Sequence, residues 1–403
     1  MALRDPILPP STIGILGGGQ LGKMIGMEAL RMGYRLAVLD PSRDAPALAM
    51  ADPHVANFHD ALAVRRLADQ CDVLTFEFEN VDPSVMDSID SRPSLEPLYV
   101  SRNRWREKSM ARSLGIKTAD FFAVDSAEEL AEAMSRPEIT RAGGAILKTC
   151  EGGYDGKGQW KLGPTDASGN PWSLEQSRLQ MDLEKAFLEV PTVAEGPRFI
   201  LECLVDFRQE FSIVGAGFND GSFVSFSPII NEHVNGVLHR SRCSADLDGL
   251  LEQSAAQTAK DAAESIAKHF QYCGTFAVEF FDTKSGIVFN EMAPRPHNSG
   301  HLTLDNALTS QFEQHVRAIC GLPPGSPGMH SSAVMINILG SDDCRLDGIE
   351  KALSIPGVRL HLYGKLESRS GRKMGHLVAL DPDLSVAVRR ADEAFSQLRW
   401  VKQ

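Results

Sequence analysis

The sequence has few of the features that mark secreted, membrane-spanning or nucleic-acid-binding proteins. Its opening residues, MALRDPILPPS, place prolines and charges where a signal peptide needs a continuous apolar stretch. No later segment forms a charge-free apolar run long enough to span a bilayer. We therefore expect a cytoplasmic protein that has no membrane partner.

Cysteine pairs with metal-ligand or redox spacing are also missing. The seven cysteines are scattered and include no C-x-x-C pair, so the sequence supports neither a disulfide framework nor a zinc site. We expect most of these residues to be small buried apolar side chains. They are Cys71, Cys150, Cys203, Cys243, Cys273, Cys320 and Cys344.

Positive charge is in deficit over the chain as a whole. The formal net charge is −12 at pH 7, and general nucleic-acid binding needs a basic surface that releases counterions. Nucleic acid is therefore excluded as an expected partner. The exception is local, because residues 359–373 hold five basic residues against one glutamate, which predicts a pocket for an anionic ligand.

Length and patterning indicate several globular domains. The chain has 403 residues, of which 43% are hydrophobic and 23% charged, and it contains no internal repeat or long low-complexity tract. Breaks at prolines and glycines predict three domains. We place a Rossmann-like α/β domain at 1–103, a central domain at 104–325, and a small β-rich domain with a closing helix at 326–403.

The first hundred residues alternate between strand and helix patterns. The strands TIGIL and RLAVLD flank a helix expected over residues 20–32, which predicts a parallel sheet covered by helices. Before the helix, Gly17, Gly19 and Gly22 have G-x-G-x-x-G spacing, and amides at a helix N-terminus favour an anion. Asp40 ends the second strand. The turn therefore predicts either a dinucleotide site or a site for another anion.

The stretch AILKTCEGGYDGKGQW, residues 145–160, predicts a phosphate-binding loop. An apolar strand carries Lys148, and the loop after it contains four glycines that leave the backbone free to wrap around a ligand. The lysine precedes the glycines and no helix follows at once, so this is not the G-x-x-x-x-G-K-[ST] loop. The alternative is a flexible surface hairpin.

Two carboxylates flank a predicted turn in TFAVEFFDTKSGIVFNEMAPRPHNSGH, residues 275–301. Glu279 and Glu291 lie symmetrically about Ser285, so a regular hairpin sets them opposite each other on one face. Paired carboxylates of this kind suit Mg²⁺ with bound phosphate oxygens. The alternative is two solvated glutamates at strand ends.

The stretch FILECLVDFRQEFSIV, residues 199–214, carries Glu202 on one strand and Glu210 on the next. A connector between them presents backbone groups suited to an adenine edge, with a carboxylate left for ribose hydroxyls. Two glutamates in an ordinary hairpin are the alternative.

In this order, the lysine and glycine loop, the hinge and the carboxylate pair make the central block resemble the ATP-grasp enzymes. GGGQLG, FEFEN, GGYDGKGQ, NEMAPRPHNSGH, and LHLYGK followed by GRKMGH are similar to the branch that carboxylates aminoimidazole ribonucleotide in purine biosynthesis. The resemblance implies an α/β ATP-grasp fold between a Rossmann-like domain and a small β-rich domain. It also implies a homodimeric ligase that uses ATP, Mg²⁺ and bicarbonate and forms carboxyphosphate as an intermediate. The product would pass to a separate mutase.

The resemblance assigns roles to individual residues. Those implied at ATP are Arg104, Lys148, Gly153, Tyr154, Asp155, Gly156, Lys157, Gly158, Gln159, Glu202, Cys203, Leu204, Val205, Glu210, His233, Asn290 and Glu291. Those implied at the ribonucleotide are Gly19, Gln20, Leu21, Glu79, Arg295, His297, Asn298, Lys365, Arg372 and Lys373. Glu279 and Glu291 are the implied metal ligands. The implied catalytic residues are Lys148, Arg295, His297, Asn298 and Asp155, of which Asp155 is the candidate for handling the proton.

Other functions remain open on the sequence alone. One is a nucleotide-binding regulatory protein with an inactive site, and another is an NAD-dependent oxidoreductase that uses the first domain. Within the ATP-grasp enzymes the alternative is formate-dependent phosphoribosylglycinamide formyltransferase, although PRPHNSGH and GRKMGH favour the carboxylase. The polar segment 163–173 departs from the family pattern and predicts a surface loop.

Overall fold

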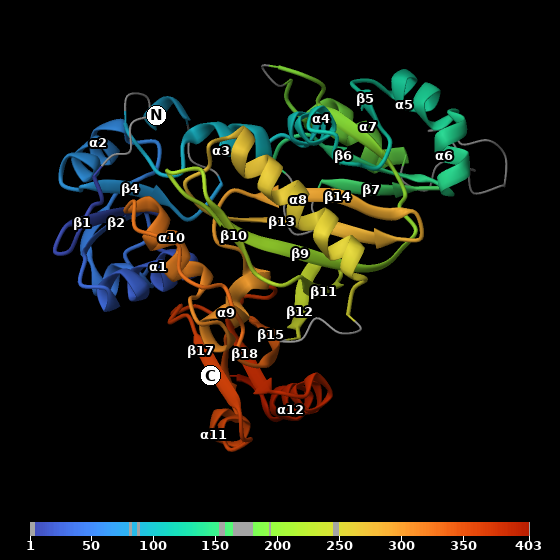
Figure 1. Cartoon of the computed structure of the whole chain (residues 1–403). Helices are drawn as coiled ribbons and strands as arrows, with labels where there is room; N and C mark the ends of the chain where they lie inside the picture. Colours follow the sequence, from blue (N-terminus) through green and yellow to red (C-terminus); the bar gives the residue numbers. More distant parts are fainter. Residues whose placement is uncertain are drawn as a thin grey trace.

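The N-terminal unit is a four-stranded parallel sheet with helices on its faces (Figure 1). The structure, a computed structural model, describes residues 5–79, 83–86, 89–152, 158–163, 180–192, 195–244 and 250–402. The strand order is β3 (Asp52–Val55), β2 (Arg35–Asp40), β1 (Thr12–Leu16) and β4 (Val73–Phe76). Helices α1 (Gln20–Arg31) and α2 (Ala61–Asp69) connect these strands. The expected strand–helix–strand order and the parallel pairing are confirmed.

A second four-stranded sheet, called the small sheet below, is antiparallel and lies apart from the first. Its order is β5 (Phe121–Val124), β8 (Phe199–Cys203), β6 (Ala145–Thr149) and β7 (Gln159–Leu162). Helices α5 (Ala127–Met134), α6 (Pro137–Ala142) and α7 (Gln180–Glu189) accompany it. Apolar side chains of these elements, such as Leu147, Phe199 and Leu130, form one buried cluster, so this sheet has its own core.

The third sheet has nine strands and runs through the middle of the molecule. Its order is β14 (Gly286–Ala293), β13 (Gly274–Thr283), β9 (Phe207–Gly217), β11 (Ile229–Val234), β12 (Val237–Cys243), β15 (Ser332–Leu339), β18 (Lys373–Asp381) and β17 (Val358–Leu362), with β10 (Phe223–Ser225) also paired to β9. Because β12 pairs with β15, the C-terminal strands β15, β18 and β17 continue the central sheet rather than forming a separate one.

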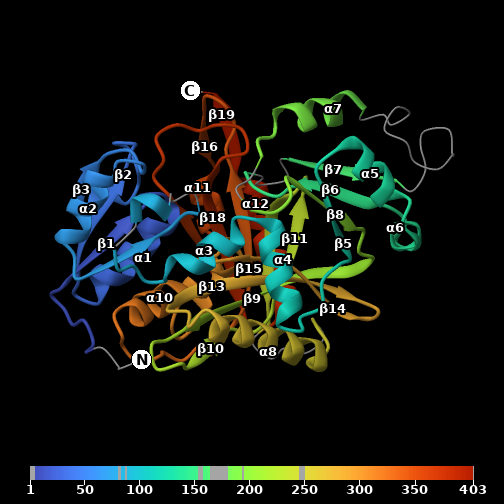
Figure 2. The same ribbon diagram turned by 90° about the horizontal axis from the view of Figure 1, so that it is seen from above.

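Helices fix the remaining elements against this sheet. Helix α8 (Gln253–His269) packs on β9, β13 and β14, and α12 (Leu384–Gln397) packs on β15 and β18. Helix α10 (Gln311–Ile319) contacts both the central sheet and α1, and its Phe312, Val316 and Ile319 share a core with the N-terminal unit. Helices α3 (Leu95–Ser101) and α4 (Arg104–Ser113) lead from the N-terminal unit to β14 (Figure 2).

Two expectations about local structure are corrected. The chain ends on strand β19 (Arg399–Lys402), which pairs with β16 (Cys344–Asp347), so α12 is not the closing element. The strands β8 and β9 belong to different sheets. Glu202 and Glu210 therefore lie on either side of a connection between sheets, and the ordinary hairpin alternative is wrong.

The burial of the cysteines and the length of the helices bear on two expectations from the sequence. All seven cysteines are free; five are buried, and Cys71 and Cys344 are half-buried, which confirms the expected apolar role for most of them. Within the described ranges, no helix is both long and apolar enough to cross a bilayer.

Candidate active site

A buried charge cluster lies where β6 and β8 of the small sheet meet helix α4. Lys148 on β6 and Lys108 on α4 each place Nζ 3.1 Å from Oε2 of Glu202 on β8. Arg104 at the start of α4 donates from its guanidinium to the carbonyl of Thr149, at 2.8 Å. Lys108 is 2% exposed and Glu202 5%. Two lysines, from α4 and β6, thus converge on one carboxylate of β8.

The charges of this cluster do not balance. Burial raises the pKa of Glu202, but the ammonium groups of Lys108 and Lys148 more than offset it and hold the pKa below its usual range. Burial lowers the pKa of Lys148, and the neighbouring Lys108 and Arg104 oppose the effect of Glu202. Two ammonium groups therefore share the Glu202 carboxylate, and this local surplus of positive charge suits an anion such as a phosphate.

Glu279 and Glu291 lie opposite each other on β13 and β14, as the sequence predicts. The register is not that of a regular hairpin, because Phe280 pairs with Phe289 and the count shifts between Glu279 and Phe280. Asn290 is the extra residue of this β-bulge. Burial, followed by the nearby Glu291 carboxylate, raises the pKa of Glu279 to about 8.

A second acid–base pair borders these carboxylates. Glu210 on β9 forms an ion pair with Nδ1 of His233 on β11. Burial lowers the pKa of His233, but the hydrogen bond to Glu210 and the negative charge of Glu279 outweigh it, so the pKa is raised. On the other side, Nε2 of His297 lies 3.7 Å from Oε1 of Glu279. Burial and the charge of Arg295 hold the pKa of His297 well below its usual range, so its ring is neutral.

The donor set fits Mg²⁺. Two carboxylates that face each other at close range, one of them buried with a raised pKa, lack the positive charge that would keep both ionised. Over the described residues, no group of three or more histidine, cysteine, aspartate or glutamate side chains forms a complete metal site. Mg²⁺ requires no such group, since it commonly takes one or two carboxylates together with substrate phosphates and waters.

The glycine turn before α1 holds a carboxylate of the protein itself. Glu77 accepts hydrogen bonds from the amides of Gly19 (2.8 Å), Leu21 (3.1 Å) and Gly22 (3.1 Å). A Cβ atom at Gly17 or Gly19 would lie 2.5 Å from the Glu77 side chain, and Gly17 has φ +100°. The glycines therefore make room for Glu77. Glu77 therefore engages three of the amides that were expected to bind an anion.

Asp40 is likewise engaged by backbone groups. Its two carboxylate oxygens accept hydrogen bonds from the amides of Gly18 and Ser42, both at 2.8 Å. A dinucleotide site of the usual kind needs this carboxylate for ribose hydroxyls. The geometry therefore argues against the NAD alternative.

Three of the residues expected at the ribonucleotide, Glu79, His297 and Asn298, lie near Arg295 in space or along the chain. The guanidinium of Arg295 pairs with Glu79, which follows β4, at 2.7 Å. His297 follows two residues after Arg295, and its Nδ1 shares a hydrogen bond of 2.9 Å with the hydroxyl of Ser299. The side-chain amide of Asn298 exchanges two hydrogen bonds with that of Asn337, so it is already satisfied inside the protein.

The basic residues expected to bind phosphate lie between β17 and β18 and at the start of β18. Lys365 donates from Nζ to the carbonyl of Lys373 at 2.8 Å, and Arg372 donates to the carbonyl of Glu367 at 2.9 Å. Burial and the charge of Arg372 lower the pKa of Lys365 to about 8, while Glu77 opposes the shift. Lys23 of α1 donates to the carbonyls of Leu362 and Tyr363, at 3.3 and 3.1 Å, and so connects this part of the chain with the helix that follows the glycine turn.

Part of the expected glycine loop cannot be placed. Gly153, Tyr154, Asp155, Gly156 and Lys157 lie outside the described residues, as does 164–173 of the predicted surface loop. The loop ends are described: Gly158 accepts the amide of Thr149 at its carbonyl, and Gln159 pairs with Lys148 across β6 and β7.

The hinge after Glu202 uses two of its amides internally. Cys203 donates to the carbonyl of Asp120 and Leu204 to that of Gly144, at 2.8 and 3.0 Å. Val205 follows them, half-buried, before β9 begins.

Three charged residues of the site were missed from the sequence. Glu77 lies within FEFEN, but only Glu79 was singled out there. Glu107 and Lys108 are buried on α4 together with Met110 and Ala111. Their position in the helix could have identified them as buried. Glu107 and Lys108 are in phase with the apolar residues of that helix rather than with its solvent-facing side.

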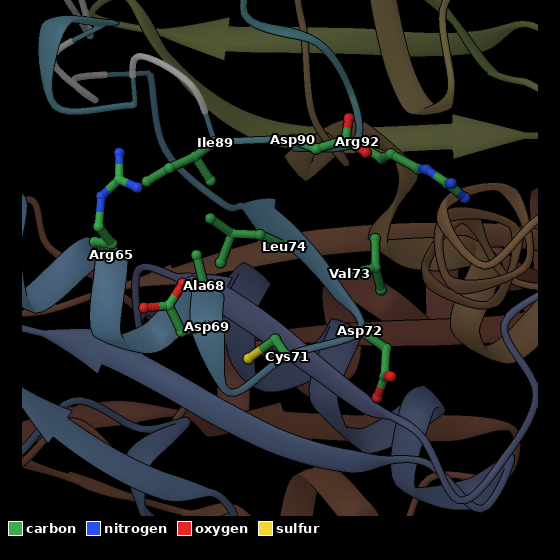
Figure 3. A pocket seen from close by; sticks show the side chains of 10 residues that line it. All are labelled: Arg65, Ala68, Asp69, Cys71, Asp72, Val73, Leu74, Ile89, Asp90 and Arg92. Atoms are coloured by element: carbon green, nitrogen blue, oxygen red, sulfur yellow. The ribbon is translucent and has the colours of Figure 1, made fainter.

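A cavity of about 260 Å³ lies at the opposite end of the N-terminal sheet (Figure 3). Its lining includes Cys71 and Asp72 before β4 and Arg65 and Asp69 of α2. Ligands of parallel α/β sheets bind beyond the carboxyl ends of the strands. This cavity lies at the amino end of β4, and it contains none of the expected site residues.

Family models match three successive segments of the chain. A ribonucleotide synthetase preATP-grasp domain matches residues 11–99 and an ATP-grasp domain matches residues 109–312. A phosphoribosylaminoimidazole carboxylase C-terminal domain matches residues 333–390. The last match covers the strands that carry the basic segment.

Named relatives extend over nearly the whole length. N5-carboxyaminoimidazole ribonucleotide synthase from Bacillus subtilis (strain 168) is 38% identical over 380 residues, which cover 93% of this chain and 92% of the relative. A solved ADP complex of an N5-carboxyaminoimidazole ribonucleotide synthetase has a TM-score of 0.84 at 37% identity, covering 97% and 98% of the two chains. The synthase from Aspergillus clavatus, solved with ADP and 5-aminoimidazole ribonucleotide, has a TM-score of 0.79 at 26% identity and covers 96% and 98%.

Proposed function

Because the chain belongs to the N5-carboxyaminoimidazole ribonucleotide synthase family of ATP-grasp enzymes, we propose that the residues described above divide the family reaction among three groups. The enzyme is an ATP-dependent ligase of purine biosynthesis. It joins bicarbonate to 5-aminoimidazole ribonucleotide through carboxyphosphate, giving N5-carboxyaminoimidazole ribonucleotide, ADP and phosphate. This division rests on one observation. The positively charged cluster at Glu202 lies close to the carboxylate pair Glu279 and Glu291.

The first group holds ATP. Lys148 and Arg104 supply the positive charge for the phosphates, and Glu210, paired with His233, is the carboxylate suited to the ribose hydroxyls. The hinge at 202–205 faces the adenine. Since the amides of Cys203 and Leu204 donate within the protein, we assign the adenine edge to the hinge carbonyls and the amide of Val205.

The second group holds the metal. We assign Glu279 and Glu291 as the ligands, and Asn290, the bulged residue beside Glu291, to the ATP phosphates. When bound, Mg²⁺ neutralises charge on the phosphate oxygens during transfer. The carboxylates fix its place, and His297 stays neutral beside Glu279, so it adds no positive charge that would compete for the pair.

The third group holds the ribonucleotide. We assign its phosphate to Lys365, Arg372 and Lys373, because the amides of the glycine turn already serve Glu77. Arg295 is paired with Glu79, and His297, two residues further along the chain, lies beside Glu279, so we assign both to orienting the reacting amine. Gly19, Gln20, Leu21 and Asn298 stay candidates for substrate contact, through atoms other than the engaged amides and side chain.

Transfer of a phosphoryl group depends on positioning and on stabilising charge rather than on covalent chemistry of the protein. Lys148 and Arg295 carry the charge required. Carboxyphosphate is destroyed by water, so the reaction needs a closed site. We propose the 153–159 loop as the element that closes it and Asp155 as the group that takes the proton from the amine.

Further proposals rest on the family and on chemistry. We propose a homodimer, a cytoplasmic location suited to seven free thiols, and transfer of the product to a separate mutase. We keep the domain boundaries at 103/104 and 325/326. The formyltransferase alternative is disfavoured by the carboxylase C-terminal domain that matches 333–390.

One assay tests the function. ADP release is measured with ATP, Mg²⁺ and bicarbonate, with and without aminoimidazole ribonucleotide. We expect release to depend on aminoimidazole ribonucleotide and to fail with glycinamide ribonucleotide and formate. Equal turnover with the formate pair would overturn the assignment.

A further inference from the structure

Two consecutive residues of α4 hold the strand segment that carries Glu291. Nζ of Lys108 donates to the carbonyl of Asn290 at 3.0 Å. Oε1 of Glu107 accepts the amide of Met292 at 2.7 Å. The two bonds therefore flank Glu291 on both sides along the backbone. Both side chains are buried, at 2% exposure each.

These bonds meet a specific need of the bulge at Asn290. A bulge disrupts the local ladder and leaves backbone groups of the extra residue without their usual partners across the strands. A buried backbone carbonyl without a hydrogen-bond partner costs free energy of folding, and Lys108 is the partner of this carbonyl. The bulge is also what brings Glu291, rather than Asn290, opposite Glu279.

Lys108 has a second partner on the other side of the nucleotide site. The same ammonium group lies 3.1 Å from Glu202, which also pairs with Lys148. One buried cation thus joins β14 of the central sheet to β8 of the small sheet. Charge-assisted hydrogen bonds to fixed backbone atoms give this joint a defined geometry.

We propose that Lys108 and Glu107 are positioning residues for the ATP and metal sites: Glu107 and Lys108 fix the bulge that presents Glu291, and Lys108 also fixes Glu202 and, through it, Lys148. The proposal rests on the proposed function only for the identity of the ligands. It assigns the two residues distinguishable effects, because Glu107 touches one side of the site and Lys108 touches both.

The test compares ADP binding in the presence of Mg²⁺ and of EDTA, measured by calorimetry, together with steady-state kinetics. Lys108→Met keeps the length of the side chain and removes its charge. We expect it to weaken ADP binding in EDTA, to reduce the strengthening of binding by Mg²⁺ several-fold, and to lower kcat/KM for ATP at least about tenfold. The KM for the ribonucleotide should stay within about twofold of the wild-type value.

Glu107→Leu removes only the acceptor for Met292. We expect it to reduce the effect of Mg²⁺ on ADP binding while leaving binding in EDTA unchanged. Glu107→Gln keeps a carbonyl oxygen that accepts the amide, so it should restore the wild-type response.

Lys117→Met is the matched control. Lys117 also donates to a carbonyl of the same hairpin, that of Ser285 at 3.1 Å, but at the turn and in an exposed position. It should leave all constants unchanged.

Each result decides the proposal. Lower thermal stability in Lys108→Met and Glu107→Leu, with wild-type kinetics and Mg²⁺ response in the folded enzyme, would mean a merely structural role and overturn it. If Lys108→Met does not fold, the Glu107→Leu and Glu107→Gln pair carries the test. A wild-type enzyme without ribonucleotide-dependent ADP release contradicts the proposed function, while the calorimetry still tests this inference.

Discussion

Glu279 on β13 lies directly opposite Glu291 on β14, and the two carboxylates differ in their surroundings. Glu279 is 9% exposed, whereas Glu291 is exposed. Next to this pair, β14 contains one residue more than β13. A cation held by this pair therefore has one ligand fixed in the protein interior and one that faces outward, where phosphate oxygens can join it.

We expect Glu291→Gln to fold normally and to lose activity. Glutamine keeps the size of the side chain but removes one anionic ligand, and loss of such a ligand corresponds to roughly a hundredfold or greater fall in kcat, about 3 kcal/mol in barrier height. The measurement is ADP release as a function of Mg²⁺ concentration. Glu264→Gln on the surface of α8 is the control. Wild-type turnover with an unchanged Mg²⁺ requirement would show that Glu291 is not a ligand.

Glu77→Gln should destabilise the N-terminal unit. The carboxylate accepts three amides at the start of α1, and a glutamine has only one accepting oxygen, so in either orientation at least one of these amides loses its acceptor. Buried donors left without a partner cost about 1–3 kcal/mol, which urea unfolding detects as a lower midpoint. The exposed Asp44 of the same unit, changed to asparagine, is the control.

The opposite outcome for Glu77 is also informative. Unchanged stability together with a lower KM for the ribonucleotide would mean that the substrate phosphate takes the place of Glu77 at the turn. That result would contradict our assignment of the phosphate to the basic segment.

The KM for the ribonucleotide should rise with pH. Burial and the neighbouring Arg372 lower the pKa of Lys365 to about 8, so its ammonium group is mostly charged at pH 7 and mostly neutral at pH 9. A phosphate dianion prefers the charged form, and we expect KM to increase about tenfold across this range. Lys365→Arg stays charged and should flatten the profile. An unchanged slope in that variant would show that another group titrates.

Arg372→Ala should separate the two phosphate sites. Arg372 lies in the basic segment, while ATP is assigned to Lys148 and Arg104, so the KM for the ribonucleotide should rise far more than that for ATP. A charge-assisted contact is worth roughly 1.5–3 kcal/mol, or about a ten- to hundredfold change. Arg369→Ala removes a neighbouring exposed guanidinium that pairs with Glu367 and serves as the control. An effect confined to ATP would place the ribonucleotide phosphate elsewhere.

The sequence by itself determined the local elements and the identity of the chemistry. Alternation of apolar runs and glycine turns determined β1, α1 and β2, because periodicity and backbone freedom are local properties. The symmetry of Glu279 and Glu291 about Ser285 predicted that they face each other. That pairing is confirmed, although it is reached through a bulge that no spacing rule indicated.

Only the tertiary structure decided which partners occupy these elements. Glu77 is 58 residues from Gly19, and Lys108 is 182 residues from Asn290. Which carboxylate fills a glycine turn, and which ammonium group supports a bulge, depends on how separate sheets pack. The sequence likewise left Glu202 and Glu210 in a possible hairpin, and the packing assigned their strands to two sheets. Local pattern specifies an element and its chemistry, whereas hydrogen bonds between distant segments are specified only once burial brings those segments together.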